Sequence, residues 1–180
     1  MNFSTSNNRS IPIRKKWGQN FLIDHNIIKK IIKIIDPHTN DKVIEIGPGK
    51  GALTLHLIKH VKKIHGIEID PLLINYLKEK KIKNLYLINK DILKLDATSI
   101  NYNKIIGNIP YNISSQIIIK FIKIDSWDSM VLMIQKELAE RINSKHGSKN
   151  YGRISVVVQT FCEIKHEFNI SKNVFLPKPK

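Results

Sequence analysis

The chain has few cysteines, few acidic residues and no long apolar run. Its single cysteine, Cys162, cannot form an intrachain disulfide, so stability does not rest on an oxidising compartment. No stretch approaches the roughly 20 apolar residues of a membrane-spanning helix. The first ten residues are polar and lack the hydrophobic region of a secretory signal. We therefore expect a soluble, cytoplasmic protein without membrane contact.

The shortage of acidic residues leaves a large positive charge. Fifteen Asp and Glu residues stand against 30 Lys and Arg, which gives a formal net charge of +15 and a pI of about 9.9. Such an excess favours a polyanionic partner. Nearly all basic residues are lysines, and a coding sequence rich in A and T would also raise their number. Because the acidic residues are not raised to match, we favour a nucleic acid as partner.

Length and composition predict a globular protein. With 180 residues, 42% hydrophobic and 25% charged, the chain is long enough for one domain with a sizeable core. We divide it into a polar tail over residues 1–11, expected to be mobile, and a domain over residues 12–180.

Residues 43–54, V-I-E-I-G-P-G-K-G-A-L-T, predict a buried strand, a glycine turn and a helix. Gly47, Gly49 and Gly51 allow positive φ angles and a close approach of backbone to a ligand. The N-terminus of the following helix would add unpaired N–H groups and a positive dipole end. This junction predicts a nucleotide-like ligand. Gly47-x-Gly49-x-x-Ala52 also fits the dinucleotide pattern, and a turn without any ligand is a further alternative.

Acidic side chains follow the next two predicted strands. Glu68 lies near the end of a strand over residues 63–69, and Asp91 follows a strand over residues 85–89. In a nucleotide-binding sheet, an acid at the end of the second strand accepts hydrogen bonds from ribose hydroxyls. We predict that role for Glu68 and contact with a purine amino group for Asp91. Asp70 is instead predicted to cap a helix.

The fourth predicted strand, residues 104–106, runs into residues 107–111, G-N-I-P-Y. An Asn-Pro-type turn is the plain interpretation. Against it, the stretch falls at the same sheet edge as Gly47, Glu68 and Asp91. The other predicted elements are helices capped by Asp24 and opened by Ser114, a fifth strand over 130–134, helices over 136–145 and 154–161 (the latter also compatible with a strand), and a sixth strand over 163–170.

Two further features leave alternatives open. The basic residues 14–16, next to Trp17, suit either a solvated face or a grip on a phosphate backbone. His56 and His60 have a spacing that can chelate zinc, but no third ligand is evident nearby. A solvated helix face is the better interpretation, so no metal is predicted.

Four motifs together resemble the ribosomal RNA adenine dimethyltransferase family, small-subunit type. They are residues 18–22 (G-Q-N-F-L), 45–51 (E-I-G-P-G-K-G), 108–111 (N-I-P-Y) and 175–180 (F-L-P-K-P-K), in the expected order. The resemblance runs over residues 14–180. It implies an α/β fold with a doubly wound, mostly parallel sheet, the Rossmann-like class I domain of enzymes that use S-adenosylmethionine. NAD enzymes lack the first and third motifs.

The resemblance also implies a role for individual residues. S-adenosylmethionine would be the methyl donor, bound by Asn20, Leu22, Gly47, Gly49, Glu68, Asp91 and Asn108. The catalytic group would be Asn108, Ile109, Pro110 and Tyr111, with Tyr111, Phe175, Lys15 and Lys16 contacting the substrate.

The implied reaction dimethylates N6 of two adjacent adenines near the 3′ end of small-subunit (16S) rRNA in an assembling particle, by a monomer. In the family the chain continues past the position of Lys180, with an antiparallel strand between the fifth and sixth strands and then a small helical domain. The resemblance therefore implies that both are missing here. Three alternatives stay open: a large-subunit methyltransferase of the macrolide-resistance type, a non-catalytic RNA-binding relative, and an NAD(P)-dependent oxidoreductase.

Overall fold

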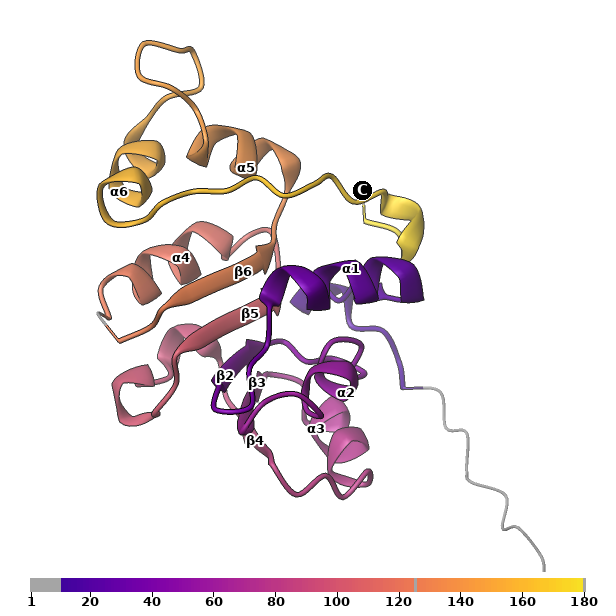
Figure 1. Cartoon of the computed structure of the whole chain (residues 1–180). Coiled ribbons are helices and arrows are strands. Elements are labelled where there is room, and N and C mark those ends of the chain that lie inside the picture. Colours follow the sequence, from indigo (N-terminus) through magenta and orange to yellow (C-terminus); the bar gives the residue numbers. More distant parts are fainter. Residues whose placement is uncertain (1–10, 125, 180) are drawn as a thin grey trace, which may run out of the picture.

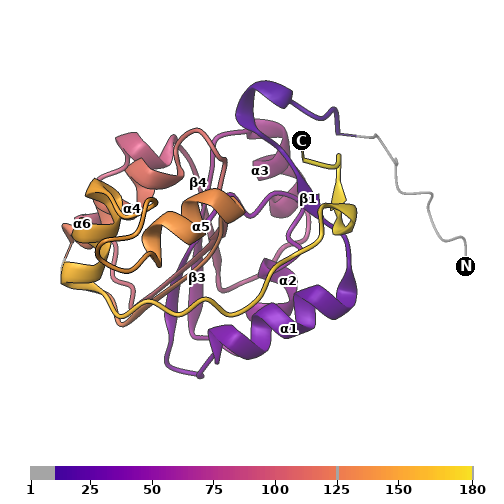
Figure 2. The ribbon, with the colours of Figure 1, turned by 90° about the horizontal axis from the view of Figure 1, so that it is seen from above.

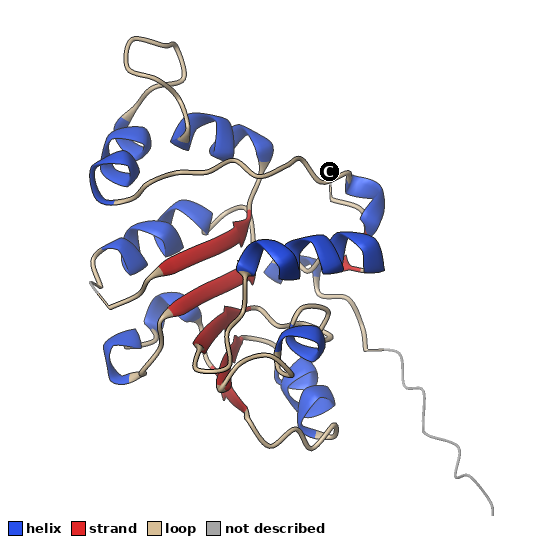
Figure 3. Ribbon diagram, viewed as in Figure 1, coloured by secondary structure: helices blue, strands red, loops and turns tan. Residues whose placement is uncertain are grey.

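A five-stranded parallel sheet between two layers of helices forms the centre of the molecule (Figures 1 and 3). The structure is a computed structural model and describes residues 11–124 and 126–179. The predicted tail therefore lies, apart from residue 11, outside the described residues. The strands have the order β4-β3-β2-β5-β6. Their bounds are β2 (Lys42–Ile46), β3 (Lys63–Glu68), β4 (Leu85–Asn89), β5 (Lys104–Asn108) and β6 (Ser129–Met133).

Helices cover both faces of this sheet, with α1, α2 and α3 on one side and α4 on the other (Figure 1). The predicted caps are confirmed: Asp24 accepts from two backbone N–H groups at the start of α1, and Asp70 accepts from Leu72 at the start of α3. The bounds are α1 (His25–Ile35), α2 (Thr54–Leu57), α3 (Pro71–Lys78), α4 (Ser114–Ile122), α5 (Lys136–Ile142) and α6 (Arg153–Phe161), with 3-10 helices η1 (Lys15–Trp17), η2 (Ile92–Lys94), η3 (Ala97–Ser99) and η4 (Lys172–Val174).

The core consists of two main apolar clusters, one on each face of the sheet. Val43 belongs to the cluster under α1 and α2, whereas its neighbour Ile44 belongs to the cluster under α4. Both side chains are fully buried, because successive side chains of a strand point to opposite faces. The central strand β2 is thus covered on both sides, as the apolar residues around Glu45 predict.

A short antiparallel pair joins the two ends of the described chain. β1 (Phe21–Leu22) pairs with β7 (Phe175–Leu176), and Ile23 N–H donates to the Val174 carbonyl at 2.9 Å. Figure 2 shows β1 beside the C-terminal end. The sequence did not predict this pairing, although both strands fall within the motifs of residues 18–22 and 175–180.

The predicted sixth strand over residues 163–170 is wrong. This segment is extended, but no backbone hydrogen bond joins it to another residue that the structure describes. Alternation of apolar and polar residues predicts a strand only when a neighbouring strand edge lies within hydrogen-bonding distance. Here the segment is separated from β6 by a groove, so the pattern has no partner.

The helix predicted after the glycine turn is shorter than the helical spacing of its apolar residues predicts. α2 contains four residues, although Ile58 and Val61 beyond it are still buried as predicted. The two residues therefore reach the core from a turn rather than from a continued helix.

Candidate active site

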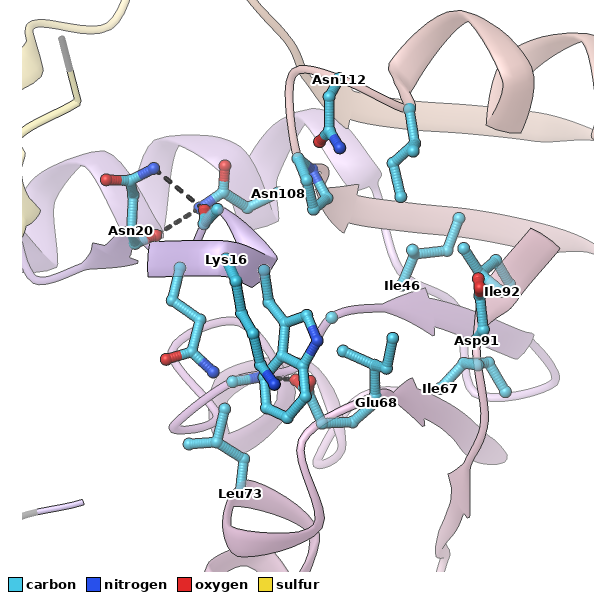
Figure 4. A pocket seen from close by; sticks show the side chains of 18 of the residues that line it. Lys16, Asn20, Ile46, Ile67, Glu68, Leu73, Asp91, Ile92, Asn108 and Asn112 are labelled. Carbon is cyan, nitrogen blue, oxygen red and sulfur yellow. Dashed lines mark hydrogen bonds between the residues drawn. The ribbon is translucent and has the colours of Figure 1, made fainter. Parts of the chain in front are cut away.

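A cavity of about 260 Å³ lies at the carboxyl ends of the parallel strands (Figure 4). Residues of the glycine turn, of the ends of β3 and β5, and of the loop after β4 all line it. This is the edge at which open α/β sheets bind ligands. Of the residues predicted to bind a cofactor, the cavity brings together Asn20, Gly47, Gly49, Glu68, Asp91 and Asn108.

The glycine turn brings backbone, rather than side chains, to the cavity. Gly47 and Gly49 have φ angles of +66° and +59°, where other residues are strained. A Cβ atom on Gly49 would also lie 3.2 Å from a ring carbon of Phe21. No residue of α2 lines the cavity, so the turn reaches it with backbone groups that precede the helix. The predicted role of the helix N-terminus stays a prediction.

Glu68 is held in place by two backbone donors. Its two carboxylate oxygens accept from Gly49 N–H at 3.1 Å and from Asp70 N–H at 3.0 Å. Burial raises the pKa of the Glu68 carboxyl, and the backbone N–H groups oppose that rise. A carboxylate has about four lone-pair sites, so each oxygen can still accept from a ligand. The Glu68 carboxyl is thus oriented before any ligand arrives.

A second buried acid, Glu45, lies behind the turn and does not line the cavity. Burial raises the pKa of Glu45 to about 7, and the nearby Glu68 charge adds to the rise. Thr54 donates its hydroxyl to Glu45 at 2.7 Å. Glu45 is therefore a buried structural acid whose charge changes near neutral pH.

Asn108 is oriented by the backbone of the N-terminal segment. Its side-chain N–H group donates to the Asn20 carbonyl at 2.8 Å (Figure 4). The Asn108 side-chain oxygen accepts no hydrogen bond from the described residues. An amide whose nitrogen is occupied presents its oxygen as an acceptor.

A larger groove of about 1290 Å³ meets the cavity at Asn108, which lines both. The groove runs along β6, α4 and residues 161–170. Tyr111 and Phe175, both predicted to contact the substrate, line this groove and not the cavity. Tyr111 and Phe175 therefore lie on the groove side of Asn108, whereas Lys16, also predicted to contact the substrate, lines the donor cavity.

The other predicted residues lie in different places. The side chains of Leu22 and Ile109 are buried in the apolar clusters. Pro110 and Lys16 line the cavity. Lys15 belongs to η1, and its side chain lies outside the part of the molecule that the structure describes.

Sequence reasoning missed several lining residues. Trp17 lines the cavity and is contacted by the cationic ends of Arg14 and Lys16, at 4.8 Å and 4.7 Å from the ring centre. Both are within cation–π distance. Asn112 also lines the cavity. Trp17 and Asn112 directly flank the motifs of residues 18–22 and 108–111, and this proximity in sequence could have identified them.

Within 11–124 and 126–179 there is no group of three or more His, Cys, Asp and Glu side chains placed to hold a metal ion. In the same residues, no helix has the length and apolar character needed to span a membrane.

Residues 11–180 match the model of the family described as ribosomal RNA adenine dimethylase. A protein of Malacoplasma penetrans named ribosomal RNA small subunit methyltransferase A is 44% identical over 92% of this chain and 62% of its own length. Proteins of the same name from Legionella pneumophila and Coxiella burnetii are 43% and 38% identical, over 67% and 69% of their lengths. The chain thus spans about two thirds of the length of these curated relatives.

Two solved structures share the fold at appreciable identity. A dimethyladenosine transferase from Plasmodium falciparum superposes with a TM-score of 0.83 and 35% identity, over 88% of this chain and 59% of that one. The 23S rRNA methyltransferase ErmE superposes with a TM-score of 0.74 and 30% identity, over 89% and 66%.

Proposed function

This chain belongs to the ribosomal RNA adenine dimethylase family, and from that premise we propose that it transfers methyl groups from S-adenosylmethionine to N6 of two adjacent adenines near the 3′ end of small-subunit rRNA. The substrate is RNA in an assembling particle, and the enzyme acts as a cytoplasmic monomer. The names of the curated relatives, ribosomal RNA small subunit methyltransferase A, support this choice of subunit.

One observation carries the proposal: Asn108 lines both the smaller cavity and the larger groove. Methyl transfer from a small donor to a large RNA needs a small site for the donor and a wide one for the target, joined at the reacting atoms. The cavity holds the donor, and the groove with Tyr111 and Phe175 admits the target adenine. An extruded base needs such stacking surfaces, because it must leave its own stack to be reached.

The residues around the cavity fit the donor. Glu68 is oriented to accept from the ribose hydroxyls, and Asp91 to accept from the adenine amino group. Asn20 and Gly47 border the methionine end. When bound, the donor supplies a methyl group on a positively charged sulfur.

Asn108 and the Ile109 carbonyl position the target nitrogen. The lone pair of an adenine amino group is delocalised into the ring, so this nitrogen is a poor nucleophile. The Asn108 side-chain oxygen and the Ile109 carbonyl accept its two N–H groups and turn the lone pair toward the methyl group. Neither oxygen accepts a hydrogen bond from the described residues. In each round an N–C bond forms as the S–C bond of the donor breaks, S-adenosylhomocysteine leaves, and the nitrogen releases one proton to the solvent. Catalysis is mostly positioning and electrostatics.

Pro110 and Tyr111 complete the site. Pro110 stiffens the backbone after Asn108 and brings no competing N–H donor. The Pro110 carbonyl is occupied by the Ser114 hydroxyl at 2.9 Å, which fixes the turn against α4. Tyr111 is 38% exposed and free to stack on a base from the groove.

A calorimetric titration with the product S-adenosylhomocysteine, with NADH as the control ligand, tests the donor. We expect saturable binding of the first and none of the second, and the opposite result would support the oxidoreductase alternative. Radiolabelled methyl transfer to undermethylated small-subunit particles and to large-subunit rRNA tests the target. The similarity to a 23S rRNA methyltransferase makes the large subunit the second candidate. Transfer only to the large subunit would overturn our choice.

A further inference from the structure

Residues 16–21, which we name the N-terminal wall, form one side of the donor cavity. All six line it, yet only the last belongs to a strand of the described structure, the two-residue β1. Such a segment depends on side-chain contacts to stay in place. Gln19 makes two of them: its side-chain oxygen accepts from Arg14 N–H at 2.7 Å, and its side-chain nitrogen donates to Asp70 at 2.8 Å.

The bond to Asp70 ties the wall to the junction between β3 and α3. The Asp70 side chain is fully buried, accepts from Leu72 N–H at 3.0 Å and lies 3.7 Å from the Arg14 guanidinium. Asp70 N–H donates to Glu68 at 3.0 Å. Among the described residues, the Gln19–Asp70 contact is the one side-chain hydrogen bond between the wall and the β3–α3 junction. A continuous series of bonds therefore joins the wall to the Glu68 carboxylate.

We propose that Gln19 is a positioning residue that holds the N-terminal wall closed over the bound methyl donor. The inference rests on the proposed function, because it takes the cavity to be the donor site. Gln19 acts by keeping Trp17 and Asn20 against the cavity, and through the Asn20 carbonyl it also keeps Asn108 oriented. Its loss opens the wall without removing any group that touches the reacting atoms.

Gln19→Leu removes both hydrogen bonds at nearly constant volume. Because one of them goes to a buried carboxylate, we expect S-adenosylhomocysteine to bind about tenfold more weakly, with the change mainly in a faster dissociation rate. Trypsin should also cut the Gln19→Leu variant faster after Arg14 and Lys16. Bound S-adenosylhomocysteine should slow this cleavage less in the variant than in the natural protein. Calorimetry, stopped-flow dissociation and mass spectrometry of the digest provide the three measurements.

Gln159→Leu is the matched control. Gln159 also bridges two backbone positions, donating to the carbonyls of Ile142 and Ser144 at 2.8 Å each. It lies on α6 and does not line the donor cavity. The control should lose stability to a similar extent but keep the ligand affinity and the slow cleavage after Lys16.

An exchange of donor and acceptor tests the bond itself. Gln19→Glu places a carboxylate 2.8 Å from the Asp70 carboxylate and should weaken binding more than Gln19→Leu. Adding Asp70→Asn supplies an amide that donates to the new carboxylate while its oxygen still accepts from Leu72 N–H. We expect this double variant to recover most of the affinity.

The outcomes separate the two proposals. If the natural protein does not bind S-adenosylhomocysteine, the donor assignment fails, whereas the digestion still shows whether Gln19 closes the wall. If the natural protein binds it and Gln19→Leu binds equally well with unchanged cleavage, the role of Gln19 is overturned while the donor site stands. Equal weakening by Gln19→Leu and Gln159→Leu would also overturn it, since both effects would then reflect stability alone.

Discussion

The two sides of β5 differ in how completely the chain covers them. We name residues 11–113 the donor half and residues 114–179 the edge half. In the donor half, β2 is covered on both faces and the buried acids Glu45 and Glu68 have hydrogen-bond partners. In the edge half, all five residues of β6 are partly exposed, and Phe161 is 69% exposed. The donor cavity has a volume of about 260 Å³, whereas the groove along the edge half has a volume of about 1290 Å³.

The donor half therefore contains a preorganised binding site, whereas the edge half presents an exposed groove. In the donor half the buried carboxyls of Glu45 and Glu68 have partners from the same half, so the acid beside the cavity is oriented before a ligand binds. In the edge half, β6 pairs with β5 along one edge only, and residues 163–170 make no backbone hydrogen bond to another described residue; both line the groove. Backbone with such unpaired edges opens more readily than backbone paired on both sides.

Asn108 joins the two halves, and its removal should have the largest effect. Asn108→Ala deletes the acceptor for the target amino group, and we expect methyl transfer to fall at least about a thousandfold, on the order of 4 kcal/mol in the barrier. Binding of S-adenosylhomocysteine should weaken but stay measurable, because Glu68 and Asp91 remain. Single-turnover methylation alongside calorimetry checks both. Normal turnover in the variant would remove Asn108 from the mechanism.

A core truncation in the donor half should have the next largest effect. Ile44→Ala empties a fully buried position in β2, and a cavity of this kind costs about 3–4 kcal/mol of the free energy of unfolding. Urea denaturation followed by circular dichroism gives the value. A loss below about 1 kcal/mol would mean that the donor half is no better packed than the edge half.

Glu45 predicts a pH dependence specific to the donor half. Because burial raises its pKa from 4.5 to about 7, the folded state holds the proton more tightly than the unfolded state. Its contribution to stability is fully present below pH 4.5 and is lost as the pH rises through 7, by about 3–4 kcal/mol in total. Glu45→Gln should abolish this loss, since the amide oxygen still accepts from Thr54.

The measurement is the difference in unfolding free energy between the natural protein and Glu45→Gln at pH 5 and pH 8. Glu140→Gln, which changes an exposed acid on α5, is the control and should leave the pH dependence unchanged. An equal slope in the natural protein and Glu45→Gln would show that Glu45 does not ionise in this range.

The smallest effect is expected in the edge half. Ile164→Ala shortens a half-buried side chain in the unpaired segment, and we expect a loss of less than about 1 kcal/mol. The same denaturation experiment as for Ile44→Ala makes the pair directly comparable. A loss as large as that of Ile44→Ala would show that residues 163–170 are as firmly packed as β2.

The sequence by itself determined the elements whose signals are local. Apolar runs and helical spacing indicate the five parallel strands, and Asp24 and Asp70 cap helices at the predicted places. The acids and amides at strand ends meet at one edge, because the carboxyl ends of parallel strands lie together. That rule let residues 60 positions apart be assigned to one cavity before any contact was known.

Only the tertiary structure decided the contacts that no local pattern encodes. The pairing of β1 with β7, the Gln19–Asp70 bond and the orientation of Asn108 by Asn20 each join residues 50 or more positions apart, and each depends on the packing of other elements. The unpaired backbone of residues 163–170 was likewise decided by the tertiary structure. Alternation of apolar and polar residues is compatible with a strand, but a strand forms only where a second backbone lies close enough to share its hydrogen bonds.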